Sequence, residues 1–374
     1  MPQSALQIAV DYLQKEVAPK ANEIDRDPAA LRKALNGLCE RDLMALKRPA
    51  EYGGPAVKED EFRRFQEECA RASGSLAFLQ TQHQSAVGMI VRSQNDALRD
   101  TYLPRMGNGE RLVGIGFSQL RRGGPPIMRA EEAMGGYILN GNVPWVTGWD
   151  YYPEFLMGAT LPDGQALFGI VPLQEGLSAE TSVGVIPQTQ TTTMKISPVM
   201  KLAAMETANT VSVQFDNFFL PIEKVVFIQP SSWIRNNDQI NIALQGHFAL
   251  GCAQAGLDIL LINAEKKPLP FLRESHDALA DELKLCREET KRAQATPTEE
   301  TTQERLNVRA WAIDLAVRCA HAAITSSSGA ANSIDHPAQR VYREALVYTV
   351  SAQTTEIMEA TLRRITHSPE RAAT

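Results

Sequence analysis

The chain has 374 residues, of which 44% are hydrophobic and 22% charged, as is ordinary for a globular protein with a large core. Its 38 basic and 44 acidic residues leave a net charge of −6, which argues against a nucleic-acid partner. No apolar run suggests a membrane-spanning helix, and the N-terminus lacks the layout of a secretory signal. The five scattered cysteines show no CxxC spacing, which predicts free thiols, a cytoplasmic location and no metal centre.

An N-terminal α-helical domain is predicted over residues 1–111. The segments 5–21, 59–72 and 75–93 carry apolar residues at three- and four-residue spacing, the pattern of amphipathic helices. The link PAEYGGPA (49–56) is rich in residues that favour turns. This part of the chain therefore predicts packed helices joined by short loops.

A middle β-domain, a barrel or sandwich, is predicted over residues 112–228. β-branched and aromatic residues are frequent in GGYILNGNVPWVTGW (135–149), PEFLMGATLPDGQALFGIVPL (153–173) and ANTVSVQFDNFFLPIEKVVFI (208–228). The turns LNGN and LPDGQA contain the residues that hairpins need for positive φ. About six to eight strands fit into this stretch.

A C-terminal four-helix bundle is predicted over residues 229–374, from helical patterns at 238–267, 271–295, 303–328 and 339–365. The first of these helices is apolar on most faces, so we expect it to be buried centrally or in a subunit interface. The fold class is therefore α+β with three domains. The junctions between a β unit and its helical neighbours are where small-molecule sites tend to lie.

The order of these segments resembles the acyl-CoA dehydrogenase family over nearly the whole chain. The motifs that carry the resemblance are LKRPAEYGG (46–54), SSGAANSIDHPAQRVYREA (327–345) and the hairpin 135–149, which is similar to the family's Y-x-L-N-G-x-K-x-W-I-T-N-G. The resemblance implies an N-terminal α-domain, a middle β-domain and a C-terminal four-helix bundle. It also implies FAD in an extended form, an acyl-CoA as the small-molecule substrate, and a homodimer or homotetramer.

The hairpin stretch NVPWVTGW (142–149) supplies the central candidate site. From the residues alone, a tryptophan in a strand is more often core than ligand contact, although Trp145 and Thr147 are expected to share a strand face. The resemblance implies that Trp145 flanks the isoalloxazine and that the Thr147 hydroxyl bonds near its reactive nitrogen. Hydrogen bonds there would tune the flavin potential. The cofactor contacts implied by the resemblance are Phe117, Ser118, Trp145, Val146 (through its backbone), Thr147, Gly329 (toward the FAD of a neighbouring subunit) and Thr354.

The catalytic base is the main departure from the family pattern. By resemblance, the glutamate base of most members falls at Ala352 and that of a minority near Asn241, and neither residue can accept a proton. Helical spacing puts Glu356 on the same stripe as Ala352, although a solvated role is the ordinary one for such a glutamate. His83, among apolar neighbours on a first-domain helix, is therefore the candidate catalytic residue, and a buried structural role is its alternative.

Two further family motifs are altered. The R-x-x-F-G that grips FAD reads EKKPLPF (265–271), and T-E-P-x-x-G-S-D reads SQLRRGGP (118–125). Arg121 and Arg122 have the chemistry to bind phosphate in compensation, or they lie in a plain solvated turn. His247 is a second candidate base, and His336, before a proline, is expected to be structural.

Three functional hypotheses follow. The first is an acyl-CoA dehydrogenase-like flavoprotein oxidoreductase that acts on CH–CH bonds without the usual glutamate. The second is a monooxygenase on the same fold, which uses reduced FAD or FMN and O₂ with His83. The third is a non-catalytic homologue that binds acyl-CoA or flavin, because fold alone does not fix the chemistry.

Overall fold

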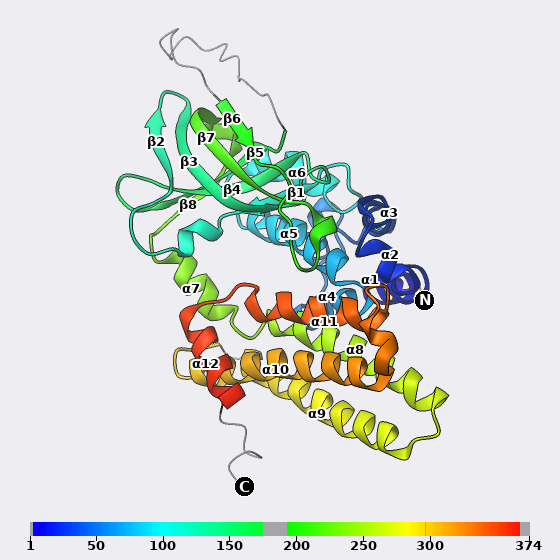
Figure 1. Ribbon diagram of the computed structural model, residues 1–374. Helices are drawn as coiled ribbons and strands as arrows, with labels where there is room; N and C mark the ends of the chain where they lie inside the picture. The colour runs from blue at the N-terminus through cyan, green and yellow to red at the C-terminus, as the bar shows by residue number, and fades with distance from the viewer. Residues whose placement is uncertain (1–2, 175–192, 296, 367–374) are drawn as a thin grey trace.

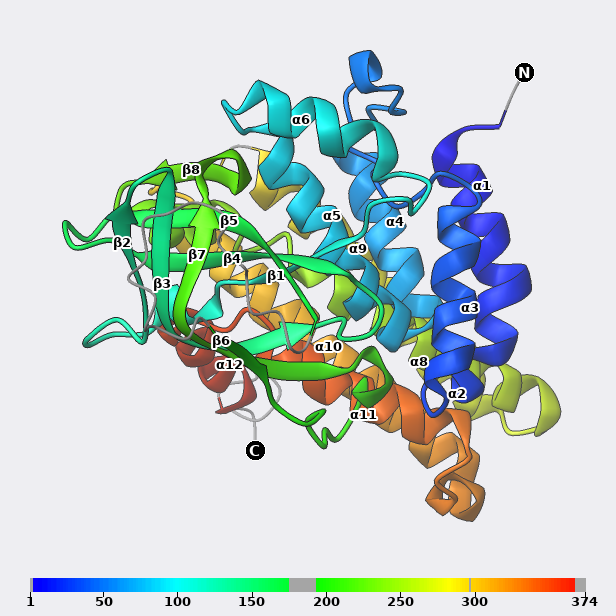
Figure 2. The same ribbon diagram turned by 90° about the horizontal axis from the view of Figure 1, so that it is seen from above.

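The computed structural model describes residues 3–174, 193–295 and 297–366. Figure 1 shows the β-sheet above, the long helices of the bundle below, and α7 linking them at one edge. Seen from above in Figure 2, α4 and α5 lie between the sheet and the outer helices α1 and α3. The predicted order of helical, β and helical parts is therefore confirmed.

The N-terminal helices begin at polar caps, as their sequences favour. Ser73 Oγ accepts from Leu76 N at 3.3 Å at the start of α5, and Asp27 caps the helix that Pro28 opens. The helices are α1 (Ala5–Tyr12), α2 (Ala21–Ile24), α3 (Pro28–Cys39), α4 (Glu59–Ala72), α5 (Gly74–Val91) and α6 (Asp96–Tyr102).

Eight strands form one sheet in the part of the chain that the structure describes. They are β1 (Val113–Gly116), β2 (Met128–Ala133), β3 (Gly136–Thr147), β4 (Glu154–Thr160), β5 (Ala166–Pro172), β6 (Thr193–Ile196), β7 (Thr210–Pro221) and β8 (Val225–Gln229). The order is β6-β7-β3-β2-β4-β5-β8, with β1 paired to β4. Strand β8 runs one residue past the predicted boundary at 228.

The two halves of the sheet are joined at one point, because β2 meets β4 only through Arg129 and Thr160. Strand β3 pairs with β2 over residues 136–141 and with β7 along most of its length. The register of β3 on β7 shifts between Val143 and Val146, which marks a β-bulge around Trp145. Both valines are buried in the β core, so the bulge pushes the intervening residues outward.

The C-terminal part contains four long helices and two short ones. They are α7 (Trp233–Ile240), α8 (Gly246–Lys266), α9 (Pro270–Ala295), α10 (Thr302–Ser327), α11 (Pro337–Val350) and α12 (Thr355–Thr366). The predictions of continuous helices over 238–267 and 339–365 are wrong at one place each. The first is interrupted by turns at 241–245, and the second at Ser351, which caps α11, and Ala352, which has φ +48°.

Helix α8 lies at the centre of the bundle, as its apolar composition predicts. It is long and apolar enough to cross a membrane by length and composition alone, but 61% of its apolar window is buried inside the protein. This is the behaviour of a core helix, so the helix is weak evidence for a membrane span. All five cysteines are buried and free, in agreement with the prediction of free thiols.

Candidate functional site

The β3 bulge separates the environments of the hairpin residues. Trp145 keeps 41% of its surface exposed, whereas Val146 is fully buried and Thr147 is 1% exposed. The Thr147 hydroxyl lies 3.0 Å from the Thr210 hydroxyl on β7. The structure thus presents the Trp145 ring to solvent, but it turns the Thr147 hydroxyl toward a neighbouring strand instead of an open face.

Phe117 and Ser118 follow β1 at the beginning of a short 3-10 turn, Ser118–Arg121. Ser118 is exposed, and the half-buried Phe117 ring meets Phe168 edge-on at 5.6 Å. Arg121 does not stand free for a phosphate, because its Nε and Nη2 donate to both oxygens of Asp238 at 2.6 and 2.7 Å. Arg122 is exposed beside it.

Gly329 lies in an open turn at the end of α10. A side chain built on Gly329 would meet nothing within 4 Å, and the preceding Ser328 has φ +57° and ψ −148°, a backbone conformation that favours glycine. Lys267 Nζ reaches this turn, where it donates to the Ser326 carbonyl and lies 3.4 Å from Ser328 Oγ. Lys267 belongs to the altered motif EKKPLPF, and the sequence alone did not indicate that its positive charge lies beside the predicted cofactor turn.

Ala352, the first of the two positions where the resemblance places a base, follows the end of α11. Ala352 is exposed and lies outside any helix, so the helical spacing that related it to Glu356 does not exist. Glu356 lies in the first turn of α12, where Thr354 Oγ accepts from Ile357 N at 3.3 Å. A hydrogen bond to Thr354 lowers the pKa of Glu356, which keeps that carboxyl ionised.

Two arginines one turn apart on α10 connect both base positions. Arg309 Nη2 donates to the Ser351 carbonyl at 3.0 Å, next to Ala352. Arg305 Nη1 donates to the Gln239 carbonyl at 2.9 Å, two residues before Asn241. Burial lowers the pKa of Arg309 to about 10, and its Nε and Nη1 have no partner among the described residues. The tertiary structure therefore brings both positions at which the resemblance places a base to one stretch of α10 that carries positive charge.

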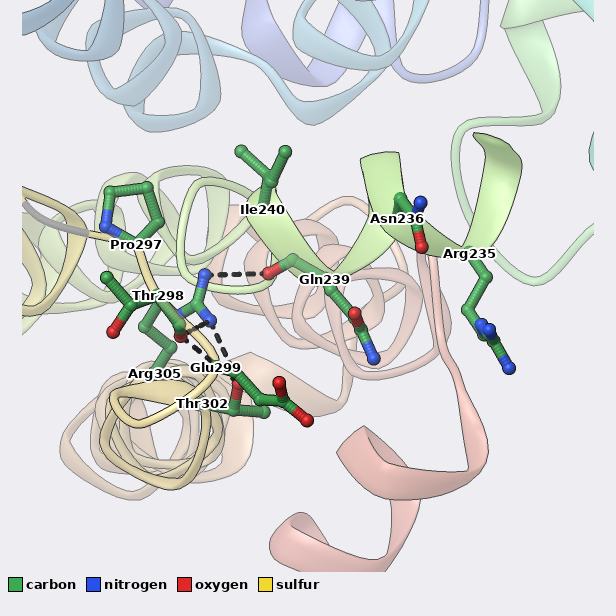
Figure 3. Close-up of a pocket in the computed structure, with 9 residues that line it drawn as sticks. All are labelled: Arg235, Asn236, Gln239, Ile240, Pro297, Thr298, Glu299, Thr302 and Arg305. Carbon is green, nitrogen blue, oxygen red and sulfur yellow. Dashed lines mark hydrogen bonds between the residues drawn. The ribbon is translucent and has the colours of Figure 1, made fainter. Parts of the chain in front are cut away.

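A cavity of about 420 Å³ opens at this stretch, between α7 and the start of α10 (Figure 3). Arg305 is 2% exposed, and its guanidinium donates to the Gln239 and Thr298 carbonyls and to Thr302 Oγ1. All of these acceptors are neutral, so no carboxylate of the described chain neutralises this buried cation. The lining residues are Arg235, Asn236, Gln239, Ile240, Pro297, Thr298, Glu299, Thr302 and Arg305.

His83, the candidate base, has backbone partners at both ring nitrogens. The side chain is fully buried on α5, Val113 N donates to Nδ1 at 2.9 Å, and Nε2 lies 3.0 Å from the Met106 carbonyl. Burial lowers the pKa of His83 to about 4, so the ring is neutral, with Nε2 as the donor. Both nitrogens are occupied by backbone that leads into β1. This geometry favours the structural role of His83, the alternative weighed from sequence.

His336, His247 and the buried carboxylate on α11 lie next to other groups of the protein. His336 caps α11 by accepting from Ala338 N at 3.2 Å, as predicted. His247 is buried with Nδ1 3.8 Å from Glu67, which Arg287 also binds. Glu344 is fully buried, pairs with Arg340 at 2.8 Å and accepts from Gly74 N at 3.0 Å. None of these groups lines the cavity.

Several predicted contacts fit a flavin cofactor. Ser118, Trp145 and Gly329 are exposed, Phe117 and Thr354 are half-buried, and Lys267 adds a positive charge at the Gly329 turn. Val146 and Thr147 do not offer side chains to a ligand. Across residues 3–174, 193–295 and 297–366, no group of three His, Cys, Asp or Glu side chains is placed to hold a metal ion.

Comparisons with known proteins agree with this architecture. Residues 3–110 match the model of the acyl-CoA dehydrogenase N-terminal domain. The chain is 24% identical to the mitochondrial isovaleryl-CoA dehydrogenase of Pongo abelii, over 96% of this chain and 86% of that protein.

Solved structures show the same fold over nearly the whole length. Butyryl-CoA dehydrogenase from Megasphaera elsdenii matches with a TM-score of 0.76 and 16% identity, over 97% of both chains. An acyl-CoA dehydrogenase from Bacillus anthracis, in complex with FAD, matches with a TM-score of 0.77 and 18% identity, over 97% of this chain and 67% of that one.

Proposed function

The chain is a distant member of the acyl-CoA dehydrogenase family, and from this premise we propose that it is an FAD-dependent oxidoreductase acting on CH–CH bonds of an acyl-CoA. The observation that carries the proposal is the cavity at α7 and α10. It combines a buried, uncompensated Arg305 with the exposed Arg235, and its lining residue Ile240 directly precedes Asn241, one of the two positions at which the resemblance places a base. Arginine pairs well with phosphate, which coenzyme A carries, and a volume of about 420 Å³ is in the range of small-molecule sites.

The cofactor is assigned to the surface between the β-domain and the bundle. FAD, when bound, supplies the acceptor for the hydride. The exposed Trp145 ring would pack on the flavin, Ser118 would donate a hydrogen bond, and the Gly329 turn with Lys267 would receive phosphate from a neighbouring subunit. The assignment to a second subunit follows the family resemblance, and with it we propose a homodimer or homotetramer.

Ala352 and Asn241, at which the resemblance places the base, cannot accept a proton, and both ring nitrogens of His83 have backbone partners. Among the residues that line the cavity, Glu299 carries the one carboxylate, and it is exposed. We therefore name Glu299 as the first candidate for proton removal.

A second candidate function, a non-catalytic homologue that binds acyl-CoA, is favoured by one observation. Neither position at which the resemblance places a base carries an ionisable side chain, and the cation Arg309 contacts the backbone next to one of them. The monooxygenase hypothesis loses support, since it depended on His83 to move a proton.

One experiment separates these functions. Purified protein, reconstituted with FAD, is mixed anaerobically with acyl-CoA esters of increasing chain length, and the visible flavin absorbance is followed. Bleaching supports the dehydrogenase, and Glu299→Gln should then slow it while Glu300→Gln, its exposed neighbour, should not. Binding of acyl-CoA without bleaching supports the non-catalytic homologue. A protein that binds neither FAD nor acyl-CoA contradicts both proposals.

A further inference from the structure

Helix α7 has two distinct faces. Arg235, Asn236, Gln239 and Ile240 line the cavity, whereas Asp238 points toward the β-domain and binds Arg121. Residues spaced in this way lie on opposite sides of a helix of eight residues. The same short helix therefore forms a wall of the cavity and contacts the turn that carries Ser118.

The β-domain side of this contact is firmly held. Gln119 Nε2 donates to the Gly158 carbonyl of β4 at 2.7 Å. A Cβ placed on Gly158 would stand 2.8 Å from Phe117 Cβ and 2.7 Å from Leu120 Cδ1, so the turn packs closely on the strand. The turn Ser118–Arg121 thus lies directly against β4, and it presents the guanidinium of Arg121 to α7.

The α7 side is held by few groups. Turns at 241–245 separate α7 from α8, so it is not carried by the long bundle helix. Its C-terminal carbonyls accept from Arg305, at Gln239, and from Gln294 Nε2, at Ile240, the latter at 3.0 Å. Its first residue, Trp233, meets the Phe168 ring at 5.0 Å, and Phe168 in turn meets Phe117. Helix α7 thus contacts the bundle at its C-terminal end and the β-domain at its first residue.

Among the residues that the structure describes, the Arg121–Asp238 ion pair is the polar contact between α7 and the β-domain. Its geometry is bidentate, which specifies orientation as well as distance, and both side chains are more than two-thirds buried. The Arg121 guanidinium also lies 5.8 Å from the centre of the Phe117 ring. A shift of α7 would therefore act on Arg121 and Phe117 together.

We infer that Arg121 and Asp238 are positioning residues that couple the α7 cavity to the cofactor-contact segment Phe117–Ser118. A ligand that draws Arg235 and Gln239 inward fixes α7, and the ion pair transmits that placement to the turn beside Ser118. The inference rests on the proposed function, since it assigns the cavity to coenzyme A and Ser118 to FAD. Coupling of this kind is reciprocal, so each ligand should tighten the binding of the other.

The test measures the FAD dissociation constant of the full-length protein with and without saturating coenzyme A. We expect coenzyme A to tighten FAD binding by about fivefold or more in the wild-type protein, a modest coupling. Arg121→Gln and Asp238→Asn should bring the ratio of the FAD dissociation constants without and with coenzyme A close to one. Asp238→Glu, which keeps a carboxylate, should restore part of this ratio. Arg122→Gln removes the same charge from the same turn and should keep the wild-type ratio.

A second measurement does not depend on any ligand. Hydrogen exchange of the free protein should quicken in Arg121→Gln at both 233–240 and 117–121, and stay unchanged in Arg122→Gln. The inference is overturned if coenzyme A tightens FAD binding to Arg121→Gln as much as to the wild type, or if hydrogen exchange is unchanged in Arg121→Gln. If the wild-type protein binds both ligands without coupling, the inference alone fails. If it binds neither, the proposed function fails with it.

Discussion

Replacing His83 with glutamine tests whether this histidine is structural or catalytic. Burial lowers the pKa of His83 from 6.5 to about 4, because the fully enclosed ring loses the water that would stabilise its charged form. The unfolded chain, in which the imidazole titrates normally, therefore binds more protons than the folded chain between these two values. The contribution of His83 to stability is fully present above the unfolded pKa, and it is lost as the pH falls toward the folded pKa.

The size of this effect follows from the two pKa values. With 6.5 in the unfolded chain and about 4 in the folded one, lowering the pH from about 7 to about 5 costs roughly 2 kcal/mol of folding free energy, since one pKa unit is worth about 1.4 kcal/mol. Glutamine has one donor and one acceptor at its amide and does not titrate in this range. The wild-type protein should therefore lose stability across this interval relative to His83→Gln.

The assay is denaturant unfolding of both proteins at a series of pH values. The unfolding free energy of the wild type minus that of His83→Gln should fall by roughly 2 kcal/mol between about pH 7 and about pH 5. His321→Gln, which removes an exposed imidazole from α10, serves as the control and should give a curve parallel to the wild type. Parallel curves for His83→Gln would refute the assignment of a buried neutral ring. Loss of turnover in a stably folded His83→Gln would instead restore this residue as the base.

Three further predictions concern the turn after α10 and the buried ion pair on α11. Ser328→Gly should raise the unfolding free energy by about 1 kcal/mol, because glycine relieves the strained φ and ψ at this position. Thermal unfolding checks this, and Ser327→Gly, at a residue with a helical φ, serves as a control that should destabilise the protein. Glu344→Gln should cost roughly 3–5 kcal/mol in urea unfolding, because it leaves Arg340 charged and buried, and adding Arg340→Met should recover part of the loss. Lys267→Gln should weaken FAD binding by roughly tenfold in a flavin fluorescence titration, and an equal loss in Lys266→Gln would contradict a specific contact.

The sequence was sufficient for the architecture because its strongest signals are local and periodic. Apolar spacing marks α4 and α5, and β-branched runs bounded by turn residues mark β3, β4 and β7. The apolar character of α8 on most faces also predicted its central place in the bundle. These properties depend on which residues follow one another, and the structure confirms them.

Helix breaks were beyond the reach of the sequence. The residues around Ala352 and those at 241–245 contain neither proline nor a glycine pair, so nothing local forbids a helix there. The backbone leaves the helix where Arg309 and Arg305 take the carbonyls of Ser351 and Gln239. Those arginines come from α10, far along the chain, and no pattern of neighbours reveals such a contact.

The candidate site divides in the same way. The sequence by itself determined the fold, the hairpin that carries Trp145, and the lack of an ionisable residue at Ala352 and Asn241. Only the tertiary structure decided that His83 is sealed by Met106 and Val113, since burial and hydrogen bonding set the pKa of an imidazole. It also decided the partner of Arg121 and the cavity beside Arg305, because these depend on which distant segments meet and on what each side chain finds there.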